Sequence, residues 1–370
     1  MSQIIPIVMP KWGLSMQEGK VNEWLVEVGT QIEVGMPILD VETDKLANAV
    51  EAPDAGLLRR CLVQAGDVLP VKALLGVLAD SSISDDEIEA FISAYTLPEN
   101  DAGESGNDTP AFQYTDVDGY RIRYLKTGNG KQTVLLIHGF GGDLNNWLFN
   151  IDELAKQHTV IALDLPAHGG SEARIFDQPG LAALAAFVVR FLDQTGTGQV
   201  SLLAHSMGGG IAAQMALDFP ERLRKLALVS PCGFGSEINM DYINGFIHAE
   251  SRRDLKPVLG LLLADPEAVS RTMIDDTLKY KRLDGIDAAL RTLRDALFTN
   301  GQQAAQPGLQ LQPERHPLLV LWGGQDHIVP SAHADNVPSG AVIQRYAGSG
   351  HMCHMDHAAE VNEVLLRHFE

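Results

Sequence analysis

Three short stretches in the second half of the chain carry residue types suited to nucleophilic chemistry. Ser206 stands in Ala204-His205-Ser206-Met207-Gly208, after an apolar run and before a stretch of small residues. Asp326 follows LLVLWGGQ, and His351 lies in AGSGHMCHMDH. A histidine can accept the proton of a serine hydroxyl while a carboxylate orients the histidine ring. The three side chains therefore predict acyl-transfer chemistry at Ser206, provided that the fold brings them together.

The surroundings of Ser206 predict a sharp turn between a strand and a helix. The run VSLLAHSMGGGIAAQMA is typical of a buried strand followed by a nucleophile elbow, although Ala204 replaces the first glycine of the usual G-x-S-x-G. A serine among glycines is weak evidence alone, since it often only begins a helix. The second signal is His138-Gly139-Phe140-Gly141-Gly142, which follows the apolar TVLLI. Its Phe140 amide can pair with the Met207 amide as an oxyanion hole.

The elements that must position these residues alternate between β-runs and helical patterns. We expect strands at residues 120–125, 133–138, 159–163, 200–205, 225–230, 318–322 and 342–346, and a helix that stops at Gly196. This alternation is typical of a mostly parallel sheet with helices on both faces, with functional groups at the carboxyl ends of strands. Residues 231–310 lack clear strands and carry amphipathic helical stretches, so we expect a helical cap there.

Residues 112–370 resemble the α/β-hydrolase family along their whole length, including DLPAHGGS at 164–171 and the chain order serine, acid, histidine. The resemblance implies that Ser206 is the nucleophile, His351 the general base and Asp326 its orienting acid. It also implies that the amides of Phe140 and Met207 form the oxyanion hole.

Other polar clusters near these motifs have alternative interpretations. His351, His354, Asp356 and His357 resemble a metal-ligand set, but their spacing scatters them around a helix start, so no metal is expected. His205 is interpreted as structural or pocket-lining, and Cys353 as a buried bystander. A basic group in the cap either meets phosphates or forms a solvated helix face: Arg252, Arg253, Lys256, Lys279, Lys281 and Arg282.

Residues 1–80 consist of short β-type runs and contain an internal repeat. A shift of 37 residues aligns Gly29 with Gly66 and Ile38 with Leu75, which indicates one β-unit used twice in a small sandwich or barrel. Glu42-Thr43-Asp44-Lys45-Leu46-Ala47 lies between the halves and predicts an exposed hairpin with Lys45 at its centre. Lys45 is then a solvated turn lysine or a presented amine.

The segment resembles a lipoyl domain, the swinging-arm carrier of 2-oxo acid dehydrogenase complexes. The resemblance rests on MPKWGLSMQEG and on Gly29, Asp44-Lys45 and Gly66, and it implies that Lys45 carries covalent lipoate. Biotin carriers usually place their lysine between methionines, whereas Asp44 and Leu46 flank Lys45. The protein would supply presentation and the cofactor the thiol chemistry.

Charge is distributed unevenly along the chain. The 370 residues hold 28 Lys and Arg against 48 Asp and Glu, a net charge of −20, which disfavours nucleic acid and anionic membrane surfaces as partners. Residues 81–111 hold eight acids and no base, and we expect an acidic linker there with a short helix at 84–95. Three scattered cysteines, no leader-like N-terminus and no long apolar run favour a soluble, cytoplasmic protein.

A small all-β lipoyl domain followed by a capped α/β-hydrolase domain resembles the dihydrolipoamide acetyltransferase components of acetoin dehydrogenase complexes. That resemblance implies transfer of an acetyl group from the lipoyl arm to coenzyme A in acetoin catabolism through a Ser206 acyl-enzyme. It implies two partners, a thiamine-diphosphate-dependent acetoin-cleaving component and dihydrolipoamide dehydrogenase. A lipoyl-tethered thioesterase and a non-catalytic carrier and docking protein remain alternatives. The oligomeric state is open, a homo-oligomer included.

Overall fold

The computed structural model describes residues 4–12, 16–43, 47–52, 54–97 and 112–370. The chain separates into two compact units, Met1–Thr109 and Pro110–Glu370. Within the described ranges, no helix has both the length and the apolar character needed to cross a bilayer.

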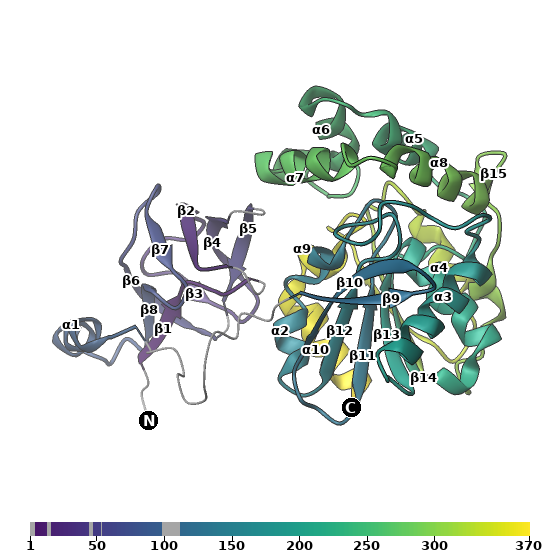
Figure 1. Cartoon of the computed structure of the whole chain (residues 1–370). Helices are drawn as coiled ribbons and strands as arrows, with labels where there is room; N and C mark the ends of the chain where they lie inside the picture. The colour runs from purple at the N-terminus through teal and green to yellow at the C-terminus, as the bar shows by residue number, and fades with distance from the viewer. Residues whose placement is uncertain (1–3, 13–15, 44–46, 53, 98–111) are drawn as a thin grey trace. The chain divides into compact units, whose positions relative to one another are not determined.

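The first unit contains two four-stranded sheets that repeat one arrangement. The first sheet has the order β1 (Ile4–Val8), β8 (Leu74–Ala79), β6 (Gly56–Cys61), β3 (Gln31–Ile32), and the second the order β5 (Ala47–Glu51), β4 (Pro37–Glu42), β2 (Glu18–Trp24), β7 (Val68–Pro70) (Figure 1). Shifting β2, β3 and β4 by 37 residues gives β6, β7 and β8 to within a residue or two. The predicted duplication of one β-unit is therefore confirmed.

The equivalent turns of the two halves need the same residue type. Gly29 and Gly66 have φ angles of 95° and 96°, a region in which a side chain would be strained. Each amide bonds across to the other half, Gly29 N to the Leu58 carbonyl and Gly66 N to the Val21 carbonyl, both at 2.8 Å. Between the sheets lies one apolar core that includes buried Ile38. Burial of these inward faces against each other makes the two halves a single folded body.

Helix α1 (Asp85–Ala94) occupies the position of the short helix expected at 84–95, but its environment differs from that of a solvated linker. Ser84 and Glu87 form the expected capping box, and Ile88 is fully buried in a small apolar cluster with Val77. Arg59 bonds to Asp85 at 2.9 Å, and Arg60 pairs with Glu89 at 3.0 Å. The acidic segment thus receives its missing basic partners from β6, a pairing that a count along the chain cannot show. Residues 98–111 lie outside the described ranges.

The second unit is built on an eight-stranded sheet. Its order is β18 (Val342–Tyr346), β17 (Leu318–Gly323), β14 (Leu223–Val229), β13 (Val200–His205), β11 (Thr133–Ile137), β12 (Thr159–Leu163), β10 (Tyr120–Thr127), β9 (Gln113–Val117). The six strands from β18 to β12 are parallel, whereas β10 and β9 are antiparallel to their neighbours. The seven predicted strands are confirmed. Strand β9 was missed because its sequence QYTDV is short and largely polar.

Helices cover both faces of this sheet. Helices α3 (Leu181–Gln194) and α4 (Met207–Asp218) pack on one face, and α2 (Ile151–Ala155) and α10 (Ala358–Phe369) lie on the other (Figure 1). Helix α3 stops just before Gly196, as predicted, where φ reaches 63°. Most of the apolar faces that meet here are completely buried. Burial on both faces explains why the central strands read as continuous apolar runs.

The predicted cap consists of four helices, α5 (Met240–His248), α6 (Arg252–Gly260), α7 (Arg271–Lys281) and α8 (Ile286–Leu297), with the 3-10 turn η3 (Pro266–Ala268) after α6. Figure 1 shows the four helices gathered at one end of the sheet. The hydroxyl of Tyr242 in α5 donates to the Phe140 carbonyl at 3.3 Å, and that of Tyr280 in α7 donates to the Ala167 carbonyl at 2.6 Å. Both acceptors lie in loops after strands β11 and β12, so the cap covers the carboxyl edge of the sheet.

Candidate active site

Ser206 lies between strand β13 and helix α4 in a backbone conformation that few non-glycine residues adopt. Its φ and ψ angles are 54° and −117°. Such strain costs on the order of 1–3 kcal/mol and persists only where surrounding structure enforces it. Three main-chain hydrogen bonds do so: Ser206 N to the Val229 carbonyl at 3.0 Å, and Cys232 N and Gly210 N to the Ser206 carbonyl at 2.9 and 3.2 Å. The turn predicted from the AHSMG motif is therefore present.

The glycines around Ser206 allow main chains to approach closely. A Cβ at Gly208 would lie 2.4 Å from the Ile137 carbonyl oxygen, so only glycine lets α4 start this close to strand β11. A Cβ at Gly139 would lie 3.0 Å from both the Ser206 Cβ and the His205 ring. The loop after β11 therefore rests directly on the elbow, which explains why both motifs are rich in glycine.

The structure brings Asp326 and His351 together. Their side chains are 0% and 1% exposed, and His351 Nδ1 donates to Asp326 Oδ2 at 2.8 Å. The other carboxylate oxygen accepts the amides of Ile328 at 2.8 Å and Val329 at 3.0 Å. These amides fix the orientation of the carboxylate. With its Nδ1 engaged, His351 keeps Nε2 as the nitrogen that can accept a proton.

The segments that carry Ser206 and His351 are connected by a hydrogen bond of His205, the residue before Ser206, and not by a direct bond between the two side chains. Among the described residues, no hydrogen bond joins the Ser206 hydroxyl to the His351 ring. His205, next to Ser206, approaches the carbonyl of His351 with its Nε2 at 3.0 Å. Catalytic contacts of this type often tighten only when substrate is bound. The arrangement thus holds His351 and Ser206 on adjoining segments.

Two unpaired amides border the elbow. Phe140 and Met207 are buried, and neither amide donates a hydrogen bond to any residue in the part of the chain that the structure describes. A buried amide without a partner is costly, and one at a helix N-terminus also carries the positive end of the helix dipole. Both amides are thus available to an oxygen that becomes negatively charged, the role predicted for them from sequence.

The loop that carries Phe140 is held from both sides. His138 donates from Nδ1 to the Gly139 carbonyl at 2.8 Å and accepts the Leu165 amide at Nε2 at 3.0 Å. Burial lowers the pKa of His138 to about 4, which keeps the ring neutral and both roles intact. On the other side, the hydroxyl of Tyr242 holds the Phe140 carbonyl. Sequence reasoning missed Tyr242, because nothing in the cap sequence marks it as a neighbour of the loop.

The residues considered as a metal set have separate partners. Instead of converging, His354 approaches the Asn146 carbonyl with Nε2 at 3.1 Å, and Asp356 accepts the Ser349 hydroxyl at 2.5 Å. His357 stacks on Tyr346. Within the described ranges, no group of three His, Cys, Asp or Glu residues is arranged to hold a metal ion.

Sequence reasoning missed one cysteine beside Ser206. Cys353 is buried, as expected, but Cys232 is the thiol within hydrogen-bonding reach of the Ser206 side chain. Burial raises the pKa of Cys232 to about 12, so the group is a protonated thiol and not a competing nucleophile. The hydrogen bond from the Cys232 amide to the Ser206 carbonyl holds the thiol at this position. The two residues are far apart in the sequence, so no local pattern predicts the contact.

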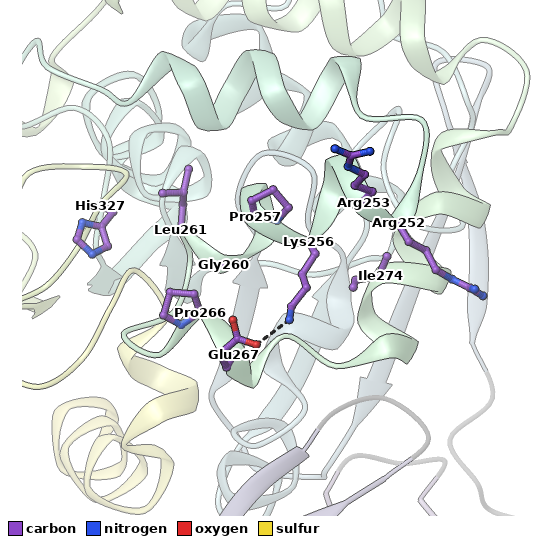
Figure 2. A pocket seen from close by; sticks show the side chains of 10 residues that line it. All are labelled: Arg252, Arg253, Lys256, Pro257, Gly260, Leu261, Pro266, Glu267, Ile274 and His327. Carbon is purple, nitrogen blue, oxygen red and sulfur yellow. Dashed lines mark hydrogen bonds and ion pairs between the residues drawn. The ribbon is translucent and has the colours of Figure 1, made fainter.

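The predicted basic group of the cap is divided. Arg252, Arg253 and Lys256 line a pocket of about 680 Å³ (Figure 2). Lys279 instead pairs with Asp276, and Lys281 donates to the carbonyl of Ile247 at 3.3 Å. The remaining member, Arg282, is exposed and does not line the pocket. Only half of the predicted group is therefore gathered at one place.

Lys45 lies outside the described residues. The strands on either side of it are paired, with Glu42 of β4 opposite Ala47 of β5. Lys45 therefore remains a site predicted from sequence.

Comparison with known proteins assigns both units. Residues 5–78 match the family described as biotin-requiring enzyme, and residues 132–358 match the alpha/beta hydrolase fold. A meta-cleavage product hydrolase from Pseudomonas fluorescens has a TM-score of 0.61 at 19% identity over 70% of this chain and 97% of its own. A carboxylesterase from Bacillus subtilis has a TM-score of 0.60 at 17% identity over 70% and 91%. At such identity these two likenesses support the fold alone.

Two curated relatives extend over nearly the whole chain. The dihydrolipoyllysine-residue acetyltransferase component of the acetoin cleaving system of Cupriavidus necator is 57% identical over 99% of this chain and 97% of its own length. The protein of the same name from Pseudomonas putida is 42% identical over 99% and 98%. The fold class predicted from sequence, a lipoyl-type domain followed by an α/β-hydrolase domain, is confirmed.

Proposed function

Because the chain belongs to the family of dihydrolipoyllysine-residue acetyltransferase components of acetoin cleaving systems, we propose that it transfers an acetyl group from a lipoyl arm on Lys45 to coenzyme A. The observation that carries the proposal is the elbow serine beside a buried His351–Asp326 pair. Ser206 is held at a φ of 54°, and the pair is joined at 2.8 Å. This is the arrangement of a serine acyltransferase or hydrolase.

The reaction proceeds in two half-steps at Ser206. In the first, Ser206 Oγ attacks the carbonyl carbon of an acetyl thioester while His351 Nε2 accepts the hydroxyl proton. The amides of Phe140 and Met207 hold the developing oxyanion. As the carbon–sulfur bond breaks, His351 passes its proton to the departing sulfur, and acetyl remains on Ser206 as an ester. Asp326 keeps the proton of His351 on Nδ1 throughout.

In the second half-step, His351 accepts the proton of an incoming thiol and so activates it. The sulfur attacks the ester, the bond to Ser206 Oγ breaks, and His351 returns the proton to the serine. The acceptor sulfur has gained the acetyl group and lost its proton, the donor sulfur has gained a proton, and no proton is released to solvent. Coenzyme A is the proposed acceptor, because the family name specifies acetyl transfer rather than hydrolysis.

The duplicated sandwich of the first unit supports the proposal that Lys45 carries lipoate. Strands β4 and β5 pair up to Glu42 and Ala47 in a four-stranded sheet packed on a buried core, and Lys45 lies between these two strands in the sequence. A reduced lipoyl group would supply a thiol that carries the acetyl group. We place its loading with a thiamine-diphosphate-dependent acetoin-cleaving component and its reoxidation with dihydrolipoamide dehydrogenase, both of which act on the same arm in the cytoplasm.

The test combines mass spectrometry with two variants. Protein produced with a lipoate supply should gain the mass of one lipoyl group, and Lys45→Arg should abolish the gain. With acetyl-dihydrolipoamide and coenzyme A as substrates, Ser206→Ala should lose acetyl-coenzyme A formation. Full activity of Ser206→Ala would contradict the proposal.

The same assay separates the two alternative functions. A lipoyl-tethered thioesterase would release acetate at the same rate without coenzyme A. A non-catalytic carrier would leave Ser206 unlabelled by a fluorophosphonate probe and would form neither product.

A further inference from the structure

The cap contains a pocket that the acetyl-transfer steps do not use. It lies between α6, η3 and α7 and has a volume of about 680 Å³ (Figure 2). Part of its wall is formed by the apolar side chains of Pro257, Leu261, Pro266 and Ile274. Apolar surfaces with a few charged groups at their edge are typical of sites for small organic ligands.

The charged groups on this pocket are mostly basic. Arg252, Arg253 and Lys256 line it, against the single acid Glu267. The rest of the chain has the opposite character, with a net charge of −20 overall. A local excess of positive charge on an acidic protein attracts anions to one place.

The three cations differ in how free they are. Arg252 is held by both oxygens of Asp275, at 2.5 and 2.8 Å. Lys256 spans the pocket to Glu267 at 2.7 Å, a pair that is partly exposed and therefore weak (Figure 2). Arg253 is exposed and makes no hydrogen bond or ion pair with any residue in the described ranges. Arg253 can thus bind an anion without breaking an existing contact. Lys256 can replace its contact with the Glu267 carboxylate by a contact with a phosphate.

The pocket adjoins the segments that carry the triad. His327 lines it, and the preceding residue is Asp326. Leu261 also lines the pocket and precedes Leu262, whose carbonyl accepts the His351 amide at 2.9 Å. Asp326 is therefore next in sequence to a lining residue, and His351 is hydrogen-bonded to Leu262, the neighbour of a lining residue.

We propose that this pocket binds the phosphate-bearing nucleotide end of the acyl acceptor, with Arg253 and Lys256 as its phosphate ligands. The proposal rests on the proposed function, since it requires an acceptor that joins a thiol to a phosphorylated nucleoside by a long flexible arm, as coenzyme A does. Arginine suits this role because its planar fork donates two parallel hydrogen bonds to a phosphate. The apolar wall offers a surface for the nucleoside.

Binding is tested without the acyl chemistry by titrating the full-length protein with adenosine 3′,5′-bisphosphate in a calorimeter. Arg253→Ala and Lys256→Gln should each weaken binding roughly tenfold, the loss expected for one charge-assisted hydrogen-bond partner. Glu267→Gln should tighten binding, because it removes the competing acid. Arg282→Ala is the matched control, an exposed cap arginine outside the pocket, and should leave binding unchanged.

Kinetics test the same assignment in the transfer reaction. Arg253→Ala and Lys256→Gln should raise the KM for coenzyme A roughly tenfold while kcat and the KM for acetyl-dihydrolipoamide stay near wild type. Equal losses from Arg282→Ala, or inorganic phosphate binding as tightly as the bisphosphate, would overturn it.

The Ser206→Ala variant separates the two proposals. It should bind the bisphosphate normally although it transfers nothing. If instead Ser206→Ala transfers acetyl groups at full rate, the triad mechanism fails while the binding data still decide the pocket.

Discussion

His205 Nε2 donates a hydrogen bond to the main-chain carbonyl of His351 over 3.0 Å, and the two imidazole rings lie 4.5 Å apart between centroids. A carbonyl oxygen can only accept, so His205 carries its proton on Nε2. Burial holds the pKa of His205 well below its ordinary value, with the neighbouring His351 and His354 as further causes. His205, the residue before Ser206, thus holds the segment that carries His351.

This contact makes His205 a positioning residue with a measurable effect. His205→Ala should lower kcat for acetyl transfer roughly 10- to 100-fold, because loss of the contact lets the base drift by a fraction of an ångström or more. His205→Gln, whose amide can donate to the same carbonyl, should recover most of the rate. The KM values should change little in both variants. Equal activity of the two variants would show that the hydrogen bond to His351 has no positioning role.

Asp326→Asn tests the orientation of the base rather than its presence. The asparagine oxygen can still accept the amides of Ile328 and Val329, so the loop should stay folded. Its NH₂ group would face His351 Nδ1, which then has to give up its proton and present the wrong tautomer. We expect kcat to fall on the order of 10⁴-fold, because the nitrogen that must accept the serine proton is then already protonated. Steady-state kinetics beside a thermal melt would check this, and a parallel collapse of Tm would favour misfolding instead.

The docking of α1 on the first unit depends on apolar burial more than on its ion pairs. Ile88 is fully buried, whereas the Arg60–Glu89 pair is partly exposed. Ile88→Ala should destabilise the packing of α1 by about 2–5 kcal/mol, and Arg60→Ala by at most about 1 kcal/mol. Hydrogen exchange followed by mass spectrometry should show faster exchange in α1 and β6 for the first variant only. Comparable acceleration in both would mean that the ion pairs hold the helix.

Buried histidines should make the second unit sensitive to mild acid. Burial lowers the pKa of His138 to about 4 and that of His168 and His354 to about 3, against 6.5 for an exposed imidazole. The unfolded chain therefore binds more protons below pH 6.5, and the folded state loses stability as the pH falls from 6.5 toward 4. Each histidine should contribute roughly 1.4 kcal/mol per pH unit in that window.

Urea unfolding of the full-length protein at several pH values between 7 and 5 measures this slope. His354→Gln keeps a donor for the Asn146 carbonyl but removes one titrating group. Its slope should be smaller by about one proton, and an unchanged slope would contradict the assignment of His354.

The elements around Ser206 were predictable because their signals are local. The apolar run, the small residues after Ser206 and the glycines of the 138–142 loop are each required within one or two turns of chain, and all appear as expected. The duplication of the first unit was equally accessible, since a repeat is a property of sequence order. The acidic composition of residues 81–111 led us to expect that α1 belongs to a solvated linker. Its basic partners lie on β6, more than 25 residues earlier in the chain, and a local count of charges does not include them.

The sequence by itself determined the two-unit organisation, the sheet of the second unit and the identity of Ser206, Asp326 and His351 as candidates, because periodicity, glycine spacing and chain order encode these. Only the tertiary structure decided which side chains meet. It placed His205 against the His351 carbonyl, Tyr242 against the Phe140 carbonyl and Cys232 beside Ser206. It also divided the basic residues of the cap, of which three line one pocket. These contacts join residues up to about 150 positions apart, and their distances depend on how strands and helices pack rather than on any local pattern.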